Sequence, residues 1–249
     1  MLMNFDDAGS GSAVVLLHSG VCDRRMWGPQ VAALRGSHRV VTPDLRGFGE
    51  TTLPPGPFSY AEDVVALLDH LDLDRAAVVG SSFGGRIALE VAASRPERVG
   101  SLLLLCPAYR GLEPTATARS FGEREDAFLE AGDLDAAVEL DIATWLGPEA
   151  STQTRDLVRM MQRHAFEVQI AAEAGDDAPR PESVEVDPAR ISAPAVVVSG
   201  DLDMDHFRNV ARHLAETIPA ARPVTLPWAA HLPSLERPDE TSRLIIDWL

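Results

Sequence analysis

A serine between glycines is the strongest chemical feature of the sequence. The segment Gly80-Ser81-Ser82-Phe83-Gly84 fits the pattern G-x-S-x-G and stands between an apolar run that predicts a strand and a pattern that predicts a helix. A sharp turn there strains the central residue and presents its hydroxyl above the sheet, while the glycines let strand and helix approach. We predict Ser82 as a nucleophile. The alternative is a Gly/Ser-rich loop without one, such as a phosphate-binding turn.

A serine hydroxyl is a weak nucleophile, so it needs a base that a third group orients. His231 follows the last expected strand, in a loop at the carboxyl edge of the sheet, where open α/β folds build their sites. We predict His231 as the base. Ordinary surface or core roles are expected for the histidines that fall on predicted strands or helices, which are His38, His70, His164, His206 and His213.

The third group is expected at the end of the strand predicted for residues 195–199. The chain there reads Gly200-Asp201-Leu202-Asp203-Met204-Asp205, and spacing alone does not choose among the three carboxylates. Two of them could belong to a solvated turn or cap the next helix. The order of serine, acid and histidine along the chain matches this kind of fold.

Backbone amides are expected to complete the site. The segment His18-Ser19-Gly20 ends the first strong strand, where a loop amide can join the amide of Phe83 in a two-donor oxyanion hole. His18 itself we interpret as structural, because it ends a buried strand and would hold the loop by hydrogen bonds.

Alternating strands and helices should bring these groups to one edge of a sheet. Apolar runs predict buried strands at residues 13–17, 39–43, 76–79, 99–105, 195–199 and 223–226, and residues 2–6 could add one more. Helical spacing predicts helices at residues 27–35, 60–73, 82–94 and 238–249, the second opened by the capping box Ser59-Tyr60-Ala61-Glu62. The alternation predicts an α/β fold with a mostly parallel central sheet flanked by helices.

The alternation stops between residues 108 and 187, where the sequence predicts helices only. Helical patterns cover residues 123–130, 134–146 and 152–173, and a polar stretch with two prolines follows at residues 175–181. We therefore expect a helical cap of residues 108–187. It would be inserted between two parts of the core, residues 1–107 and residues 188–249.

Composition and charge exclude several classes of function. The 249 residues include 22 Lys plus Arg and 38 Asp plus Glu, and the formal net charge of −16 disfavours nucleic acid as a partner. The sequence contains no lysine, which removes Schiff-base, Walker A and protein-kinase chemistry. Cys22 and Cys106 lack the spacing of a disulfide framework, zinc site or redox motif. We expect no metal.

The sequence also predicts where the protein works. No apolar run reaches the length of a membrane span, and the acidic amino terminus is unlike a signal peptide. We therefore expect a cytoplasmic protein that acts on a small molecule, away from the membrane.

Five segments in register resemble the α/β-hydrolase fold superfamily, in its branch of small cofactor-free serine hydrolases that includes enol-lactonases and esterases. They are His18-Ser19-Gly20, Asp44-Leu45-Arg46-Gly47-Phe48-Gly49, Gly80 to Gly85, Gly200-Asp201-Leu202-Asp203, and His231-Leu232-Pro233 with Glu236-Arg237-Pro238. The resemblance spans essentially the whole chain. It assigns the triad acid to Asp203 and the oxyanion amides to Gly20 and Phe83, with Val21 as a substitute.

The resemblance implies a serine hydrolase that cleaves an ester, lactone or thioester of a small, hydrophobic molecule through an acyl-enzyme. Serine at the turn argues against epoxide hydrolase and dehalogenase chemistry, for which relatives use aspartate. Leu232 stands where C–C hydrolases typically carry tryptophan. Two alternatives remain, namely a C–C bond hydrolase, lyase or cyclase with the same triad, and a ligand receptor on a hydrolase scaffold.

Bulky side chains near the expected site are candidates for contact with substrate. Those of the cap have packing between helices as their alternative role. Trp228 places a ring near the base where the family commonly has glycine. The candidates are Val21, Trp145, Met160, Met161, Phe166 and Trp228.

Overall fold

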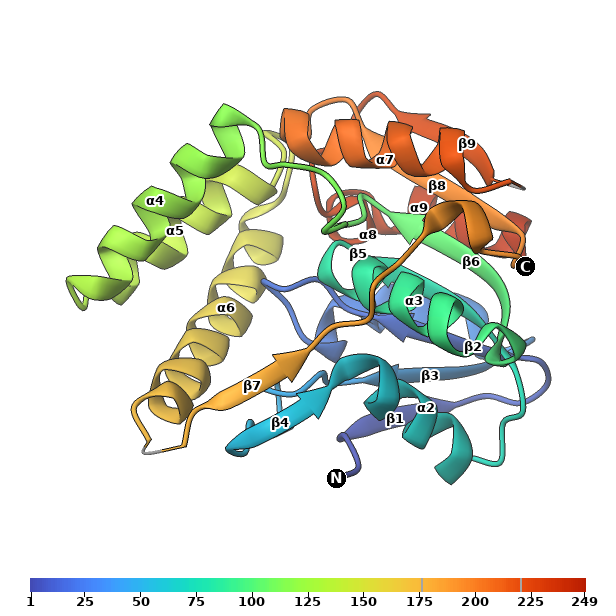
Figure 1. The fold of residues 1–249 in the computed structure, drawn as a ribbon. Helices are drawn as coiled ribbons and strands as arrows, with labels where there is room; N and C mark the ends of the chain where they lie inside the picture. The colour runs from blue at the N-terminus through green and yellow to red at the C-terminus, as the bar shows by residue number, and fades with distance from the viewer. Residues whose placement is uncertain (176, 220) are drawn as a thin grey trace.

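A seven-stranded sheet forms the centre of the molecule (Figure 1), within residues 1–175, 177–219 and 221–249, which the computed structural model describes. Its strands are Phe5–Ala8 (β1), Ala13–Leu17 (β2), Arg39–Pro43 (β3), Ala76–Ser81 (β5), Val99–Leu105 (β6), Ala195–Gly200 (β8) and Ala221–Leu226 (β9). They lie in the order β1-β3-β2-β5-β6-β8-β9. β1 runs antiparallel to β3 and the other neighbours pair in parallel, which confirms the predicted mostly parallel sheet.

Helices cover both faces of the sheet, because successive strand residues point to opposite sides and both sides are apolar. Val15 and Leu17 of β2 pack into one buried cluster, to which the helices Tyr60–His70 (α2), Phe83–Ser94 (α3) and Asp205–Thr217 (α7) contribute. Val14 and Leu16 pack into the other, with the 3₁₀ helix Arg24–Trp27 (η1) and the helices Gly28–Leu34 (α1), Pro233–Glu236 (α8) and Pro238–Trp248 (α9).

Three helices between β6 and β8 stand to one side of this core, at the left of Figure 1. They are Ala116–Glu130 (α4), Leu134–Trp145 (α5) and Thr152–Glu173 (α6). The side chain just before each helix accepts a hydrogen bond from an amide of the first turn. These side chains belong to Thr115 before α4, Asp133 before α5 and Ser151 before α6. They occupy the segment expected to form a cap, although the division of the chain into core and cap stays a prediction. Within the described residues, none of the helices has the apolar length that a bilayer crossing requires.

The prediction that residues 108–187 contain helices only is wrong at one place. Pro179–Glu182 forms a strand, β7, which pairs in parallel with Gly56–Ser59, β4, in a separate two-stranded sheet. Both segments contain proline, which has no N–H to donate and therefore makes a sequence look unlike a strand. A two-stranded ribbon tolerates it, because each strand has a neighbour on one side only. Short 3₁₀ helices lie at Pro96–Arg98 (η2), after α3, and at Pro188–Arg190 (η3), before β8.

Candidate active site

Ser82 occupies a sharp turn between β5 and α3. Its backbone has φ 48° and ψ −109°, a conformation that residues with a side chain rarely adopt. Gly80 permits the turn, since a Cβ there would lie 2.5 Å from the carbonyl oxygen of Gly84. The Ser82 N–H donates to Leu105 O at 2.9 Å, and Ser82 O accepts from the Ala108 N–H at 3.0 Å. The end of β6 therefore holds the strained turn in place.

Ser82, His231 and Asp203 form one continuous hydrogen-bonded chain. Ser82 Oγ lies 2.8 Å from His231 Nε2, and His231 Nδ1 lies 3.0 Å from Asp203 Oδ1 and 2.9 Å from Oδ2. The three residues follow β5, β9 and β8, at the carboxyl edge of the sheet, and all are buried. Because the carboxylate accepts from Nδ1–H, the lone pair of Nε2 is left to face the serine hydroxyl.

Of the three candidate acids, the structure brings Asp203 to the imidazole. Asp203 Oδ1 also accepts from the Met204 N–H at 2.7 Å, which fixes the carboxylate. Asp201 is exposed, while Asp205 Oδ1 accepts from the Thr115 hydroxyl at 2.8 Å and so ties α7 to the start of α4. The turn after β8 thus separates three acids that spacing alone left equivalent.

A half-buried carboxylate holds the loop that carries His231. Glu236 Oε2 accepts from the Ala230 N–H and Oε1 from the Leu232 N–H, both at 3.0 Å, so the amides on either side of His231 are fixed. Gly147, just beyond α5, packs against the same carboxylate, since a Cβ added there would clash with Glu236 Oε2. Burial raises the pKa of Glu236, although these donors favour its charged form. Glu236 therefore joins the loop of the base to the inserted helices.

Aromatic rings pack around the imidazole of His231. The ring centroid of Phe207 lies 4.2 Å from that of His231, and the centroid of Trp145 lies at 4.7 Å. The His231 N–H also donates to Trp145 O at 3.2 Å. These rings cover the imidazole with apolar surface, and electrostatic interactions are stronger beside apolar surface than in water.

The loop after β2 lies against the turn of Ser82. The Gly84 N–H donates to His18 O at 3.0 Å, and a Cβ added at Gly20 would meet Phe83 Cβ at 3.5 Å. Phe83 is the first residue of α3, where amides have no acceptor within the helix. Gly20 and Phe83 are therefore neighbours beside the serine, where the oxyanion amides were predicted.

The structure confirms that His18 holds this loop by hydrogen bonds. Its Nε2 accepts from the Leu45 N–H at 3.0 Å, and its Nδ1 donates to Ser19 O at 2.8 Å. One donor and one acceptor require the neutral ring. Burial lowers the pKa of His18 and so favours that form.

Cys106 lies beside the acid and the base. Ligand atoms of Cys106, Asp203 and His231 lie within 4.8 Å of one another, as they would around a metal ion. Burial, however, raises the pKa of the Cys106 thiol well above its ordinary value, and the thiol donates to Ala230 O at 3.6 Å. A metal would need a thiolate and a free imidazole nitrogen, whereas both nitrogens of His231 are engaged. The group fits hydrogen bonding better than metal binding.

A cavity of about 260 Å³ opens onto Ser82 and His231. Three of the predicted contact residues, Val21, Trp145 and Phe166, line it. One wall comes from loops and helix α7 of the core, and we call it the sheet-edge wall; the other comes from α4, α5 and α6, and we call it the helical wall. The remaining described lining residues are Ser19, Gly20, Phe121, Glu125, Asp141, Gln162, Gln169 and Phe207.

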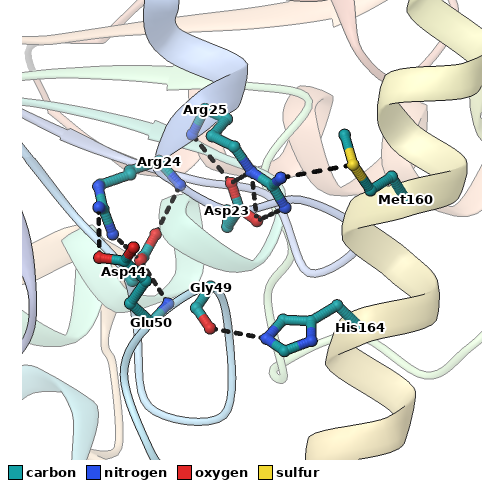
Figure 2. Close-up of a pocket in the computed structure, with 8 residues that line it drawn as sticks. All are labelled: Asp23, Arg24, Arg25, Asp44, Gly49, Glu50, Met160 and His164. Atoms are coloured by element: carbon teal, nitrogen blue, oxygen red, sulfur yellow. Dashed lines mark hydrogen bonds and ion pairs between the residues drawn. The ribbon is translucent and has the colours of Figure 1, made fainter.

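The other three predicted contact residues lie elsewhere, which corrects that part of the sequence analysis. Met160 is 52% exposed and its sulfur accepts from Arg25 Nη1 at 3.7 Å, in a separate cavity of about 340 Å³ beside α6 (Figure 2). Met161 is buried in a core cluster, and the ring of Trp228 packs under the Arg237 guanidinium at 4.9 Å. Helical spacing marks an apolar face without showing which of two adjacent residues turns to the cavity.

Four polar side chains of the helical wall were not predicted. They are Glu125 on α4, Asp141 on α5, and Gln162 and Gln169 on α6, and all four line the cavity. A signal for one of them exists in the sequence, because Asp141 stands on the apolar stripe of α5 with Val138 and Ile142 and is fully buried. A charged residue on such a stripe is rare unless it is paired.

The assembled groups can attack an electrophilic carbon. A buried hydroxyl, hydrogen-bonded to an imidazole that a carboxylate orients, is an activated nucleophile, and neighbouring backbone amides can hold negative charge on an oxygen. This chemistry suits acyl transfer and needs no further group.

Comparison with known proteins points to one family. Residues 14–244 match the model of the alpha/beta hydrolase family. RutD of Pseudomonas savastanoi pv. phaseolicola, which bears the name of a carbamate hydrolase, is 29% identical over 95% of this chain and 93% of its own length. A thermophilic esterase from Thermogutta terrifontis has a TM-score of 0.82 at 29% identity, covering 99% of this chain and 92% of that one. The enol-lactonase from Burkholderia xenovorans has a TM-score of 0.78 at 26% identity, with 98% and 95% covered.

Proposed function

Because the chain belongs to the alpha/beta hydrolase family and is a hydrolase, we propose that it cleaves an ester, lactone or thioester of a small molecule through a triad of Ser82, His231 and Asp203. The observation that carries the proposal is the 2.8 Å contact between Ser82 Oγ and His231 Nε2. The esterase and the enol-lactonase that share this fold support the substrate class.

In the first half of the reaction Ser82 Oγ attacks the carbonyl carbon while His231 Nε2 takes the hydroxyl proton. Asp203 orients the imidazole and stabilises its cation. The amides of Phe83 and Gly20, or of Val21 in place of Gly20, hold the oxyanion. When the tetrahedral intermediate collapses, the bond to the leaving oxygen or sulfur breaks and the leaving group takes the proton from His231.

Water completes the reaction. His231 Nε2 takes a proton from a water molecule as its oxygen attacks the acyl carbon. The second intermediate collapses with loss of Ser82 Oγ, which recovers the proton from the imidazole. The products are the carboxylic acid and the alcohol or thiol.

The cavity supports a small substrate. Its volume of about 260 Å³ lies below the range of roughly 300–1,000 Å³ of sites that hold drug-sized ligands. The aromatic rings of Phe121, Phe166 and Phe207 give it apolar surface.

A panel of p-nitrophenyl esters, lactones and thioesters tests the proposal, together with labelling by a fluorophosphonate. We expect Ser82→Ala to lower ester kcat/KM by about 10⁴-fold or more and to abolish labelling. Ser81→Ala is the matched control and should keep both. Labelling of Ser82 without ester turnover would favour C–C cleavage or lyase chemistry, and neither labelling nor turnover would favour a receptor.

Carbamate hydrolysis by the same triad is the second candidate. The observation in its favour is the likeness to RutD, which extends over 95% of this chain. Phenyl carbamate and phenyl acetate differ only by an amino group in place of a methyl group. A higher kcat/KM for the carbamate would favour this candidate over simple esters.

A further inference from the structure

Residues that carry hydrogen-bond acceptors line the helical wall of the cavity. Asp141 is fully buried and Gln162 is 4% exposed, and both line the cavity together with Glu125. Each of the three inserted helices contributes one of these residues. Water does not solvate Asp141 and Gln162 at this depth. Burying a polar group costs free energy unless the group has a hydrogen-bond partner.

Donors from the protein hold the Asp141 carboxylate on two sides. Its Oδ1 accepts from Trp145 Nε1 at 2.9 Å and its Oδ2 from Gln162 Nε2 at 2.8 Å. The Glu125 carboxyl is hydrogen-bonded to it as well. Trp145 also packs against the imidazole of His231, so this group of residues adjoins the reacting centre.

Gln162 leaves an acceptor unused. Its Oε1 is one of the buried side-chain atoms of the described residues that have no hydrogen-bond partner. The amide cannot rotate to give this oxygen a donor, because Nε2 must face the Asp141 carboxylate and two oxygens there would repel. A buried acceptor without a donor costs about 1–3 kcal/mol. A ligand that brings N–H groups into the cavity would satisfy it.

The charge of the cavity also favours a ligand that donates hydrogen bonds. Burial raises the pKa of Glu125 to about 8, and the neighbouring Asp141 adds to this shift. Burial also raises the pKa of Asp141, while its hydrogen bonds from Glu125, Trp145 and Gln162 favour the carboxylate. These hydrogen bonds therefore favour a protonated Glu125 that donates to a charged Asp141. Among the described residues of the lining, no arginine is present to neutralise that charge.

We infer that Asp141, Gln162 and Glu125 form a subsite for a protonated amine, so that the substrate is an ester or related acyl compound that carries an ammonium group. The inference rests on the proposed function and specifies its substrate. The ammonium N–H would donate to the Asp141 carboxylate or to Gln162 Oε1, so a single N–H is enough. Such charge-assisted bonds in a buried site are stronger than bonds between neutral groups.

Two pairs of esters that differ by N–H⁺ against C–H test the inference. Phenyl 4-(dimethylamino)butanoate is compared with phenyl 5-methylhexanoate, which places the charge on the acyl side. 2-(Dimethylamino)ethyl acetate is compared with 3-methylbutyl acetate, which places it on the alcohol side. The subsite can face only one side of the ester bond. For the pair that places its charge on that side, we expect kcat/KM near pH 7 to be higher for the cationic ester by about tenfold or more. A ratio near one for both pairs overturns the inference, while turnover of the neutral esters would leave the proposed function intact.

Variants locate the preference. Asp141→Asn should reduce the ratio to about one, since the amide keeps the shape and loses the charge. Glu125→Gln should keep most of the ratio, because its amide resembles the protonated acid. Glu139→Gln is the matched control: it removes one charge from the exposed face of α5, where Glu139 pairs with Arg159, and should leave the ratio unchanged. An equal fall in Glu139→Gln would mean that the total charge, and not this subsite, attracts the cation, and would overturn the inference.

A binding measurement decides the matter if no ester is turned over. Calorimetry on Ser82→Ala compares the affinities for the two members of each pair, and thermal melting confirms that each variant is folded. Tighter binding of the cationic member by about tenfold, lost when Asp141→Asn is added, supports the subsite. Equal affinities overturn it. The proposed function fails on its own if the wild-type protein hydrolyses none of the esters of either panel.

Discussion

The sheet-edge wall and the helical wall enclose the same cavity but are built differently. Ser82, His231 and Asp203 stand in turns directly after parallel strands, whose ladder hydrogen bonds fix where each turn begins. Glu125, Asp141 and Gln162 stand inside helices, and they meet only because three helices pack at one particular rotation. The first wall holds the groups proposed to react, and the second holds the groups of the proposed amine subsite.

A change at the sheet edge should cost more activity than any change in the helical wall. Asp203→Asn keeps the side-chain shape but no longer selects the imidazole tautomer that leaves Nε2 free, so we expect ester kcat to fall by about 10³- to 10⁴-fold. The matched control is Asp205→Asn, which alters a bond to Thr115 and should stay within about threefold. If Asp203→Asn and Asp205→Asn lowered ester kcat equally, the contact with His231 would not be what distinguishes Asp203 from Asp205.

Where the two walls join, a smaller effect is expected. Glu236→Gln replaces one acceptor by a donor, so either the Ala230 or the Leu232 N–H loses its partner and the His231 loop shifts. We expect ester kcat to fall by about 10- to 100-fold and the free energy of unfolding by about 1–3 kcal/mol. Glu240→Gln, at an exposed pair with Arg237 on α9, provides the comparison and should change neither quantity measurably. Unaltered kcat in Glu236→Gln would show that the base does not depend on this anchor.

The smallest expected effect concerns stability in the helical wall. Glu125 has an ordinary pKa of 4.5 and a pKa of about 8 in the folded protein, where burial and then the neighbouring Asp141 and Asp126 oppose its charge. Between these values the folded state binds more protons than the unfolded state, so the free energy of unfolding falls as pH rises from 4.5 to about 8 and is level above that. In Glu125→Gln this fall in the free energy of unfolding should be smaller by about 1 kcal/mol, a figure reduced for solvent screening of a partly exposed side chain. Urea unfolding of both proteins at several pH values over this range measures it. The same pH dependence in the two proteins would contradict the prediction.

The same contrast explains what the sequence could predict. Apolar runs bounded by turn residues located the central strands, and the groups at their ends could be placed at one edge because parallel strands finish together. Asp203 could not be separated from Asp201 and Asp205 by spacing, since the turn decides which carboxylate points inward. Strand β7 was missed because prolines hide it.

Within the inserted helices, the predicted bounds were right for α5 and α6, whereas α4 begins at Ala116 and not at residue 123, and the side-chain predictions failed in part. Helix α6 occupies the predicted residues, yet Met160 points to another cavity and Met161 into the core. Periodicity gives the apolar face of one helix, whereas the rotation of that helix against its neighbours depends on contacts that are distant in sequence. Asp141 was therefore detectable as an anomaly on α5 but could not be assigned to the cavity.

The end of α5 and the loop of His231 are bound to each other. Trp145 O accepts from the His231 N–H, and Gly147 packs against the Glu236 carboxylate that holds the amides on either side of His231. A substitution that displaces the end of α5 should therefore also displace the imidazole, so the inserted helices and the proposed base form one mechanical unit.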